Sequence, residues 1–559
     1  MDLDRLRSDI DLRNFLVTDD LRRSQFHLNP ERLHPAWLFS CTIRMLVVLD
    51  GGGFGNADFG LDEFLNAFHT RPGPGVRFHV TKAHQGNDAD ADINGFVFSA
   101  HDLSRYDVIW LFGVVGFGSL PAADLRALAQ FMDGGGGVFA TGDHESLGVK
   151  MCGAVPRVRS MRKWHWPNPG PNGEPLAPSG TGTGRYDTVV DVRLGGPAIF
   201  DDQSDATPQR IRVKMYATPH PFLWGHTFRY PHPVLCGPGG VIDILPDHAH
   251  EGECYVPADL TAVLTQNGYA CTEYPPDSTG QRISPEVIAW SHNQSGISEK
   301  GPVNPGTFGA IGVLDGHRAN VGRVLVDATW HHFFNINLRG ENGNPNAELS
   351  AGFYHTQPGR DALARIKAYY RNIGVWLARG STHRCIANRG WWWVRWQHRI
   401  AMDLAQINRP FSKVDAYEII RIGRIARDVM GKFAPQCQTL ERILIYIPVE
   451  IRVKLLWPIV PPGPMLPDFP LEGVEKLRSD PASAAIAQAL LDGAVGAIIY
   501  RLATEFPDPE MGEKLEGMGD NLTEMLQEAA KHGLSAGAAM AREGLDNARD
   551  LREGLDRML

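Results

Sequence analysis

The fold is decided by residues 111–148, LFGVVGFGSLPAADLRALAQFMDGGGGVFATGDHESLG. The stretch opens on the end of an apolar strand and a Gly-rich turn, and a helix with apolar residues every three or four positions follows over 125–132. Four glycines, 134–137, end that helix, and the apolar run 138–140 leads into the polar sequence GDHE. Strand, helix and strand form a βαβ unit, and open parallel sheets bind ligands at the carboxyl ends of their strands.

Similar elements lie on both sides of this unit. Apolar or alternating runs predict further strands at 44–49, 77–82, 106–112, 210–216, 241–245, 286–290, 308–314 and 323–327. Helical spacing predicts helices at 61–68 and 360–377. Strands separated by helices in this way indicate an α/β fold with a doubly wound, mostly parallel sheet.

The chain of 559 residues is longer than one hydrophobic core normally supports. Residues 1–40 form a polar N-terminal extension, and 41–378 form the α/β domain with a long insertion at 151–290. Residues 379–559 have an all-helical pattern, interrupted by a Pro-rich connector.

Composition narrows the class of protein. The formal net charge of −9 gives no strong nucleic-acid signal. The seven cysteines are scattered singly and no secretory leader is visible, so we expect reduced thiols in a cytoplasmic protein. The apolar segment 484–503 contains charged residues and is expected to fall below the threshold for a membrane span. Peripheral membrane contact through the tryptophans near 391–396 is a less favoured alternative.

Acids and imidazoles follow three of the predicted strands. They lie in the segments 143–145, 247–253 and 327–332, and Asp50 ends the first strand. A histidine beside a carboxylate can move protons near neutral pH. The predicted catalytic residues are Asp50, Asp143, His144, Glu145 and His331.

The same residue types bind divalent metals such as Zn, Fe or Mn. The candidate metal ligands are His144, His248, His250, Glu251 and His331. None of these segments has a high-specificity metal signature, so a metal-free polar site and purely structural histidines remain as alternatives.

Substrate contacts are expected from two loops and from the closing strand. The glycines after the first strand do not match a dinucleotide fingerprint and suit a tight loop close to a small ligand. The long loop 151–186 interleaves basic and aromatic residues and is predicted to act as a lid over an anionic substrate. The candidate substrate-binding residues are Gly52, Gly53, Arg157, Arg159, Trp164, Asp327 and His332.

Several motifs resemble the class I glutamine-amidotransferase-like superfamily, and most closely its ThuA-like (trehalose-utilisation) branch. They are YDVIWLFG at 106–113, FMDGGGGVFATGDH at 131–144, HPVL at 232–235 and GRVLVDATWH at 322–331. The resemblance covers about 41–378 and implies a flavodoxin- or amidotransferase-like sheet and a sugar-like substrate. This chain departs from the amidotransferases at the turn after 138–140, which holds Asp143 and His144 and no cysteine before Cys152. Thioester chemistry on glutamine is therefore not expected.

Two functions follow. The first is an enzyme of hydrolase or isomerase type that acts on a small polar substrate by acid–base or metal-assisted chemistry. The second is a catalytically silent sensor or scaffold whose helical C-terminal half binds a protein partner or a second copy of the chain. Leu545, Ala548, Leu555 and Leu559 fall near heptad spacing and favour such a contact.

Overall fold

The structure is a computed structural model. The residues that it describes are 41–69, 76–143, 146–164, 206–219, 227–237, 240–246, 252–277, 280–293, 296–298, 301–303, 306–395, 400, 404, 407, 409–433, 446–447, 481–507, 518 and 520–558. The predicted N-terminal extension, 1–40, lies outside them.

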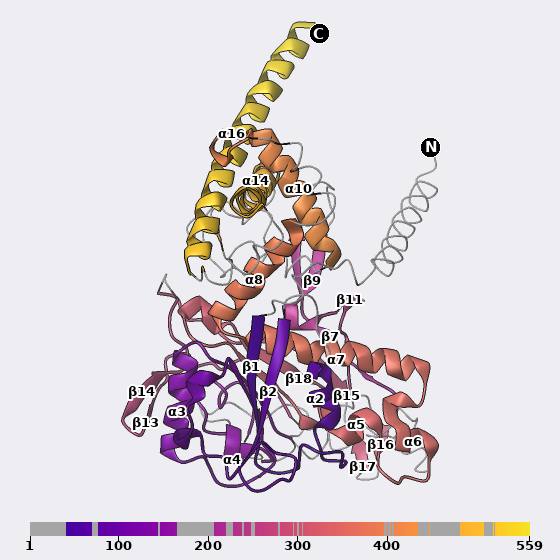
Figure 1. The fold of residues 1–559 in the computed structure, drawn as a ribbon. Helices are drawn as coiled ribbons and strands as arrows, with labels where there is room; N and C mark the ends of the chain where they lie inside the picture. Colours follow the sequence, from indigo (N-terminus) through magenta and orange to yellow (C-terminus); the bar gives the residue numbers. More distant parts are fainter. Residues whose placement is uncertain are drawn as a thin grey trace.

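A nine-stranded sheet organises the first part of the chain (Figure 1). Its strands, in spatial order, are β3 (Ile93–Asn94), β2 (Val76–His84), β1 (Cys41–Leu49), β4 (Val108–Phe112), β5 (Gly137–Thr141), β19 (Val324–Asp327), β18 (Gly306–Leu314), β15 (Glu286–Asn293) and β7 (Arg212–Val213). Neighbours from β3 to β19 are parallel, whereas β18, β15 and β7 form an antiparallel edge. The α/β class is confirmed, and the sheet is mixed.

Helices cover both faces of the sheet because alternate residues of each central strand are apolar on opposite sides. On one face, α2 (Asp62–His69), α5 (Asn335–Arg339) and α7 (Gln357–Leu377) enclose a core that includes Met45, Trp110 and Phe139. On the other face, α3 (Ala122–Asp133) and α4 (Val149–Cys152) pack over Leu46 and Ile109. This arrangement is the doubly wound one.

Most of the described strands between β5 and β18 form short antiparallel pairs outside the main sheet. These pairs are β6 (Gln209–Arg210) with β12 (Ile244–Leu245), β8 (Met215–Pro219) with β9 (Thr227–Pro231), β10 (Cys236–Gly237) with β11 (Gly240–Val241), β13 (Val263–Gln266) with β14 (Tyr269–Thr272), and β16 (Gly296–Ser298) with β17 (Gly301–Val303). The predicted single strand 210–216 is therefore divided among three short strands, because only Arg212 and Val213 reach the main sheet.

The C-terminal helices have a core of their own. The chain passes through α8 (Gly380–Arg395) to α10 (Ala416–Phe433), α14 (Pro481–Glu505) and α16 (Asp520–Met558) (Figure 1). Within α14, Ile486–Glu505 has a mean hydropathy of 1.4 and could span a membrane by length and composition, so the expectation that it falls short is wrong. In the structure 72% of this window is buried, as in the central helix of a bundle.

A disulfide joins Cys41, the first residue of β1, to Cys385 in α8, with 6.0 Å between their Cα atoms. The expectation of reduced thiols is wrong for this pair, so the cysteines no longer favour a cytoplasmic location. Neither spacing nor local sequence points to the pairing, since the two cysteines are 344 residues apart. Cys152, Cys236, Cys254 and Cys271 are buried and form no disulfide within the described part of the chain.

The close approach of α10 and α14 gives the first prediction. A Cβ added at Gly496 would lie 1.7 Å from the carbonyl oxygen of Ile419, whereas one at Gly544 in α16 would meet nothing within 4 Å. Gly496→Ala should therefore destabilise the protein by about 1–3 kcal/mol through overpacking. Gly544→Ala should stabilise it by up to about 1 kcal/mol, because alanine loses less backbone entropy in a helix. Denaturant unfolding followed by circular dichroism measures both, and equal effects would contradict the described contact.

Candidate active site at the carboxyl ends of β5 and β19

The pairing of β5 with β19 brings two distant polar turns together. The strands are parallel, and Asp327 lies opposite Thr141. The residues that follow each strand therefore leave the same edge of the sheet. A hydrogen bond from the Trp330 backbone N–H to the Gly142 carbonyl oxygen, 2.8 Å long, joins the two turns directly.

Asp143 and His331 meet at this edge. His331 Nε2 lies 3.2 Å from Asp143 Oδ2, and both side chains are buried. The Thr329 hydroxyl donates to Asp143 Oδ1 over 2.7 Å and accepts the His331 backbone N–H over 3.1 Å. Both carboxylate oxygens are thus engaged, and the histidine ring is held in one orientation, stacked on Trp330.

A second histidine–carboxylate pair lies beside the first. His332 Nδ1 is 2.6 Å from Asp327 Oδ1, and the Tyr369 hydroxyl of α7 donates to Asp327 Oδ2 over 2.8 Å. Burial raises the pKa of Tyr369 well above its ordinary value, so this hydroxyl stays protonated and remains a donor. His332 is fully buried, and the Tyr370 hydroxyl donates to its carbonyl oxygen. This pair supports the turn from the side of the core.

Arg162 ties the two turns together and is not among the predicted site residues. Its guanidinium is fully buried and donates to the Ala328 carbonyl oxygen over 2.7 Å and to the Asp143 carbonyl oxygen over 2.8 Å. It also stacks on Trp164 at 4.4 Å. Burial lowers its pKa and the charges of Asp143 and Asp327 oppose that shift, but an arginine stays cationic in either case. A positive charge therefore lies beneath the two carboxylates.

Asp50 lies at the point where the strand order reverses. The chain runs from β1 to β2 on one side and returns to β4 on the other. Asp50 Oδ1 accepts the backbone N–H groups of Val114 (2.6 Å) and Val115 (3.2 Å) from the loop after β4. Oδ2 is buried and makes no hydrogen bond within the described part of the chain. Burial raises the pKa of this carboxyl group, and the two backbone donors act against the shift.

The glycine loop after β1 closes on itself. Gly52 has a φ of +72°, and a Cβ there would lie 2.8 Å from the Phe59 carbonyl oxygen. Gly53 pairs with Gly60 in an isolated bridge. The loop is therefore tight, as the sequence suggests, but its close contacts are with the protein itself.

Three predicted substrate-binding residues are engaged inside the protein. Arg157 donates to the carbonyl oxygens of Glu273 and Thr272 and is paired with Asp133, and Arg159 is paired with the Glu273 carboxylate at 2.8 Å. Trp164 is fully buried. Arg157 and Arg159 tie the start of the insertion to the end of α3 and to the end of β14. Residues 151–164 are packed against the core and do not form a lid, and the rest of the predicted lid lies outside the described residues.

Five other predicted residues also lie outside the described part of the structure. These are His144, Glu145, His248, His250 and Glu251. Among the residues that the structure does describe, no group of three or more His, Cys, Asp or Glu side chains could hold a metal ion. The predicted metal set therefore keeps only His331 within the described geometry.

Cys152 does not replace the missing amidotransferase nucleophile. Its thiol is buried and directed at the Thr141 carbonyl oxygen, 3.8 Å away. Burial raises its pKa well above the ordinary value, with the charge of Asp50 acting in the same direction. The thiolate needed for attack is thus disfavoured.

Comparisons with known proteins add little. No family model and no curated protein matches the sequence. Among solved structures, a ThuA-like protein from Parabacteroides merdae matches with a TM-score of 0.18 and 12% identity, over 58% of this chain and 88% of that one. A likeness this low carries no argument about the fold or the reaction.

The raised pKa of Asp50 gives the second prediction. The protonated carboxyl is favoured in the folded state, so its contribution to stability is complete below the unfolded pKa and is lost as pH rises through the folded pKa. Asp50→Asn keeps an oxygen acceptor and removes this loss. The stability of the variant relative to the parent should therefore increase from pH 3 to neutral pH, measured by denaturant unfolding.

Asp259→Asn provides the control for that series. Hydrogen bonds from Thr261 lower the pKa of this exposed carboxyl, so the stability of the parent relative to the variant should increase as pH rises. If the stability difference between variant and parent changes with pH in the same direction for both variants, burial does not set the pKa of Asp50.

Proposed function

We propose that this protein is an enzyme that uses Asp143 and His331 for acid–base chemistry on a small polar substrate. The observation that carries the proposal is the buried contact between these two side chains at the carboxyl ends of adjacent parallel strands. Open sheets of this kind bind their ligands at this edge. Buried carboxylate and imidazole groups cost folding free energy unless they are paired, and pairs of this kind recur in proton-transfer sites.

The geometry defines the role of each member of the pair. The Asp143 carboxylate accepts from His331 Nε2, so the neutral ring carries its proton there and its lone pair on Nδ1. Nδ1 is then the atom that takes a proton from the substrate or from water and returns it later. Asp143 stabilises the imidazolium that forms, and Thr329 holds Asp143 in place.

Asp50 supplies a second carboxyl group with a different environment. Its raised pKa favours the protonated form, whereas the Asp143 carboxylate contacts His331 and lies near the charge of Arg162. Two carboxyl groups in contrasting environments at one edge suit a reaction that needs both a proton donor and a proton acceptor. Hydrolysis and isomerisation of polyhydroxylated compounds have this requirement, and the motif resemblance points to sugar-like substrates.

The third prediction tests the pair. Asp143→Asn and His331→Gln should each lower kcat by roughly 10²- to 10⁴-fold, the usual contribution of a positioned acid or base. The assay is a panel of glycosides, sugar lactones and aldoses followed by chromatography. His355→Gln changes an exposed histidine and should leave turnover intact. Retained activity in both site variants would reject the proposal.

Elemental analysis of the same proteins separates the metal-assisted version from the metal-free one. Stoichiometric Zn, Fe or Mn in the parent that is lost in both His144→Ala and His331→Ala would assign the cofactor. No metal in the parent, together with lost activity in His331→Ala, would support proton transfer by the imidazole alone.

A second candidate function is favoured by the exposed end of α16. Leu545, Leu551 and Leu555 are 52%, 69% and 55% exposed, and this part of the helix extends beyond α10 and α14 (Figure 1). Exposed leucines at roughly helical spacing suit a partner helix. A scaffold or sensor could recruit a protein, or a second copy, through this face.

The fourth prediction concerns that surface. If it mediates self-association, sedimentation equilibrium should show a concentration-dependent dimer that disappears when all three leucines are replaced by glutamine. Replacing exposed Arg542, Glu543 and Arg549 by glutamine is the matched control and should preserve the dimer. A parent that stays monomeric at all concentrations would reject self-association through α16.

A further inference from the structure

A cavity lies at the amino ends of β1 and β4, whereas the proposed active site lies at the carboxyl ends of the strands. It has a volume of about 560 Å³, which is in the usual range for sites that bind small molecules. The strands β1 and β4 begin there, and the first turns of α8 close it from the other side. Its lining residues are Cys41, Thr42, Arg44, Ser104, Asp107, Arg379, Ser381, Thr382 and Cys385.

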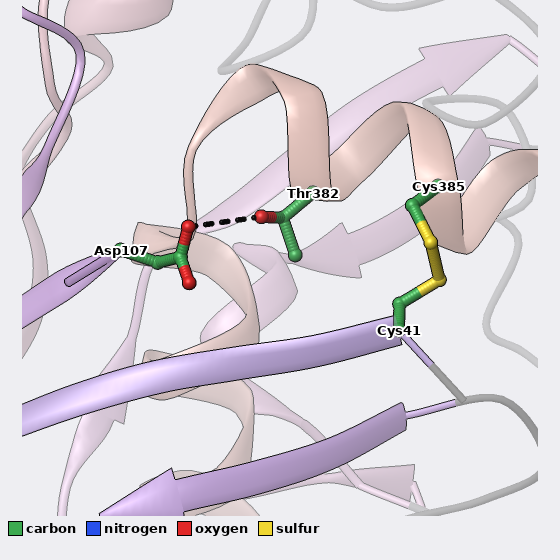
Figure 2. Close-up of a disulfide and its surroundings, with 4 residues drawn as sticks. All are labelled: Cys41, Asp107, Thr382 and Cys385. Carbon is green, nitrogen blue, oxygen red and sulfur yellow. Dashed lines mark hydrogen bonds between the residues drawn. A yellow bond between two sulfur atoms is a disulfide. The ribbon is translucent and has the colours of Figure 1, made fainter. Parts of the chain in front are cut away.

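Both cysteines of the disulfide belong to this lining. Cys41 is buried at the start of β1, and Cys385 is half-buried on the second turn of α8 (Figure 2). A small thiol that enters the cavity therefore meets the disulfide without any unfolding of the protein. The sulfur of Cys385 is the more accessible target of the two.

The cavity has a net positive lining. Arg44 and Arg379 face it against a single carboxylate, Asp107. Asp107 is already engaged, since it accepts the Arg44 backbone N–H (2.8 Å), Arg44 Nε (3.3 Å) and the Thr382 hydroxyl (3.2 Å; Figure 2). Arg379 donates to the carbonyl oxygens of Tyr106 and Gly134, which carry no formal charge. An anion is favoured here, and so is a thiolate that leaves the disulfide.

We propose that Cys385 is a thiolation site, at which a small thiol bearing carboxylates enters this cavity and opens the Cys41–Cys385 disulfide. The thiolate attacks Cys385 Sγ and forms a mixed disulfide, and the Cys41–Cys385 bond breaks with its electron pair on Cys41 Sγ, which then takes a proton. A second thiolate then attacks the sulfur of the bound small thiol, and the bond to Cys385 breaks with its electron pair on Cys385 Sγ, which takes a proton. The two small thiols are oxidised to their disulfide, and the protein disulfide is reduced to two thiols.

The reaction alters the joint between the sheet and the C-terminal helices. The disulfide is a covalent link between β1 and α8, and the start of α8 is also held by the hydrogen bond of Thr382 with Asp107 and by the packing of Ile386 in the core. Opening the disulfide should therefore loosen α8 and leave the active-site edge of the sheet unchanged. The proposal is independent of the proposed enzyme activity, because the two sites lie at opposite ends of the strands.

The test uses the full-length oxidised protein. A peptide map without reductant should show the Cys41 and Cys385 peptides crosslinked. The protein is then treated with glutathione, 2-mercaptoethanol or cysteamine, which are anionic, neutral and cationic thiols, at matched thiolate concentrations. Mass spectrometry follows loss of the crosslink and the mixed disulfide on Cys385, and hydrogen exchange follows α8.

We expect glutathione to react fastest with the folded protein and to be trapped on Cys385. Arg44→Gln should reduce its advantage over 2-mercaptoethanol by roughly two- to fivefold, the contribution of one exposed ion pair. Arg126→Gln, on an exposed part of α3, should leave the advantage unchanged. Exchange in α8 should rise on reduction and equally in Cys385→Ser.

Three results would overturn the proposal. They are absence of the crosslink, reduction only under denaturing conditions, and equal rates for the three thiols in the parent protein. The circular dichroism spectrum of Arg44→Gln confirms that the variant is folded, so a loss of selectivity in it reports on charge.

Discussion

The parallel pairing of β19 with β5 is the constraint on which the rest of the structure depends. Between β5 and β19 the chain forms the insertion and adds β7, β15 and β18 to the far side of the sheet, and β19 then pairs with β5. Only that register places the turn after Thr141 against the turn after Asp327. The buried Arg162 and the backbone bond from Trp330 to Gly142 then fix the two turns to each other. A one-residue slip would turn Asp327 to the opposite face of the sheet and separate it from Tyr369.

The two ends of the strands have different chemistry. At the carboxyl ends lie Asp50, Asp143, Asp327, His331, His332 and the buried Arg162, and burial raises the pKa of Asp50. At the amino ends, two arginines and a disulfide line an open cavity. The close-packed strands between them keep their spacing because such interiors yield little to strain. A change at one end therefore need not disturb the other.

Local patterns predicted much of the sheet, and long-range contacts explain what they missed. The unit at 111–148 folds as expected because each strand and helix is specified by its own residues. The meeting of Asp143 with His331 followed from the rule that parallel strands end at one edge. The reversed direction of β15 and β18 depends on the path of the insertion, which no local pattern encodes. Arg157 points into the protein because it bonds Glu273, and Cys41 forms its disulfide with Cys385 in α8. Both partners are remote in sequence, so no local pattern predicts these contacts.

The length of α16 has a mechanical consequence. Its 39 residues, at about 1.5 Å of rise for each, make a rod of roughly 58 Å, and only the first part of the rod is clasped by α14. A small tilt of α16 where it packs against α14 would therefore move its free C-terminal end through a large distance. The free tip also stands well clear of the sheet (Figure 1).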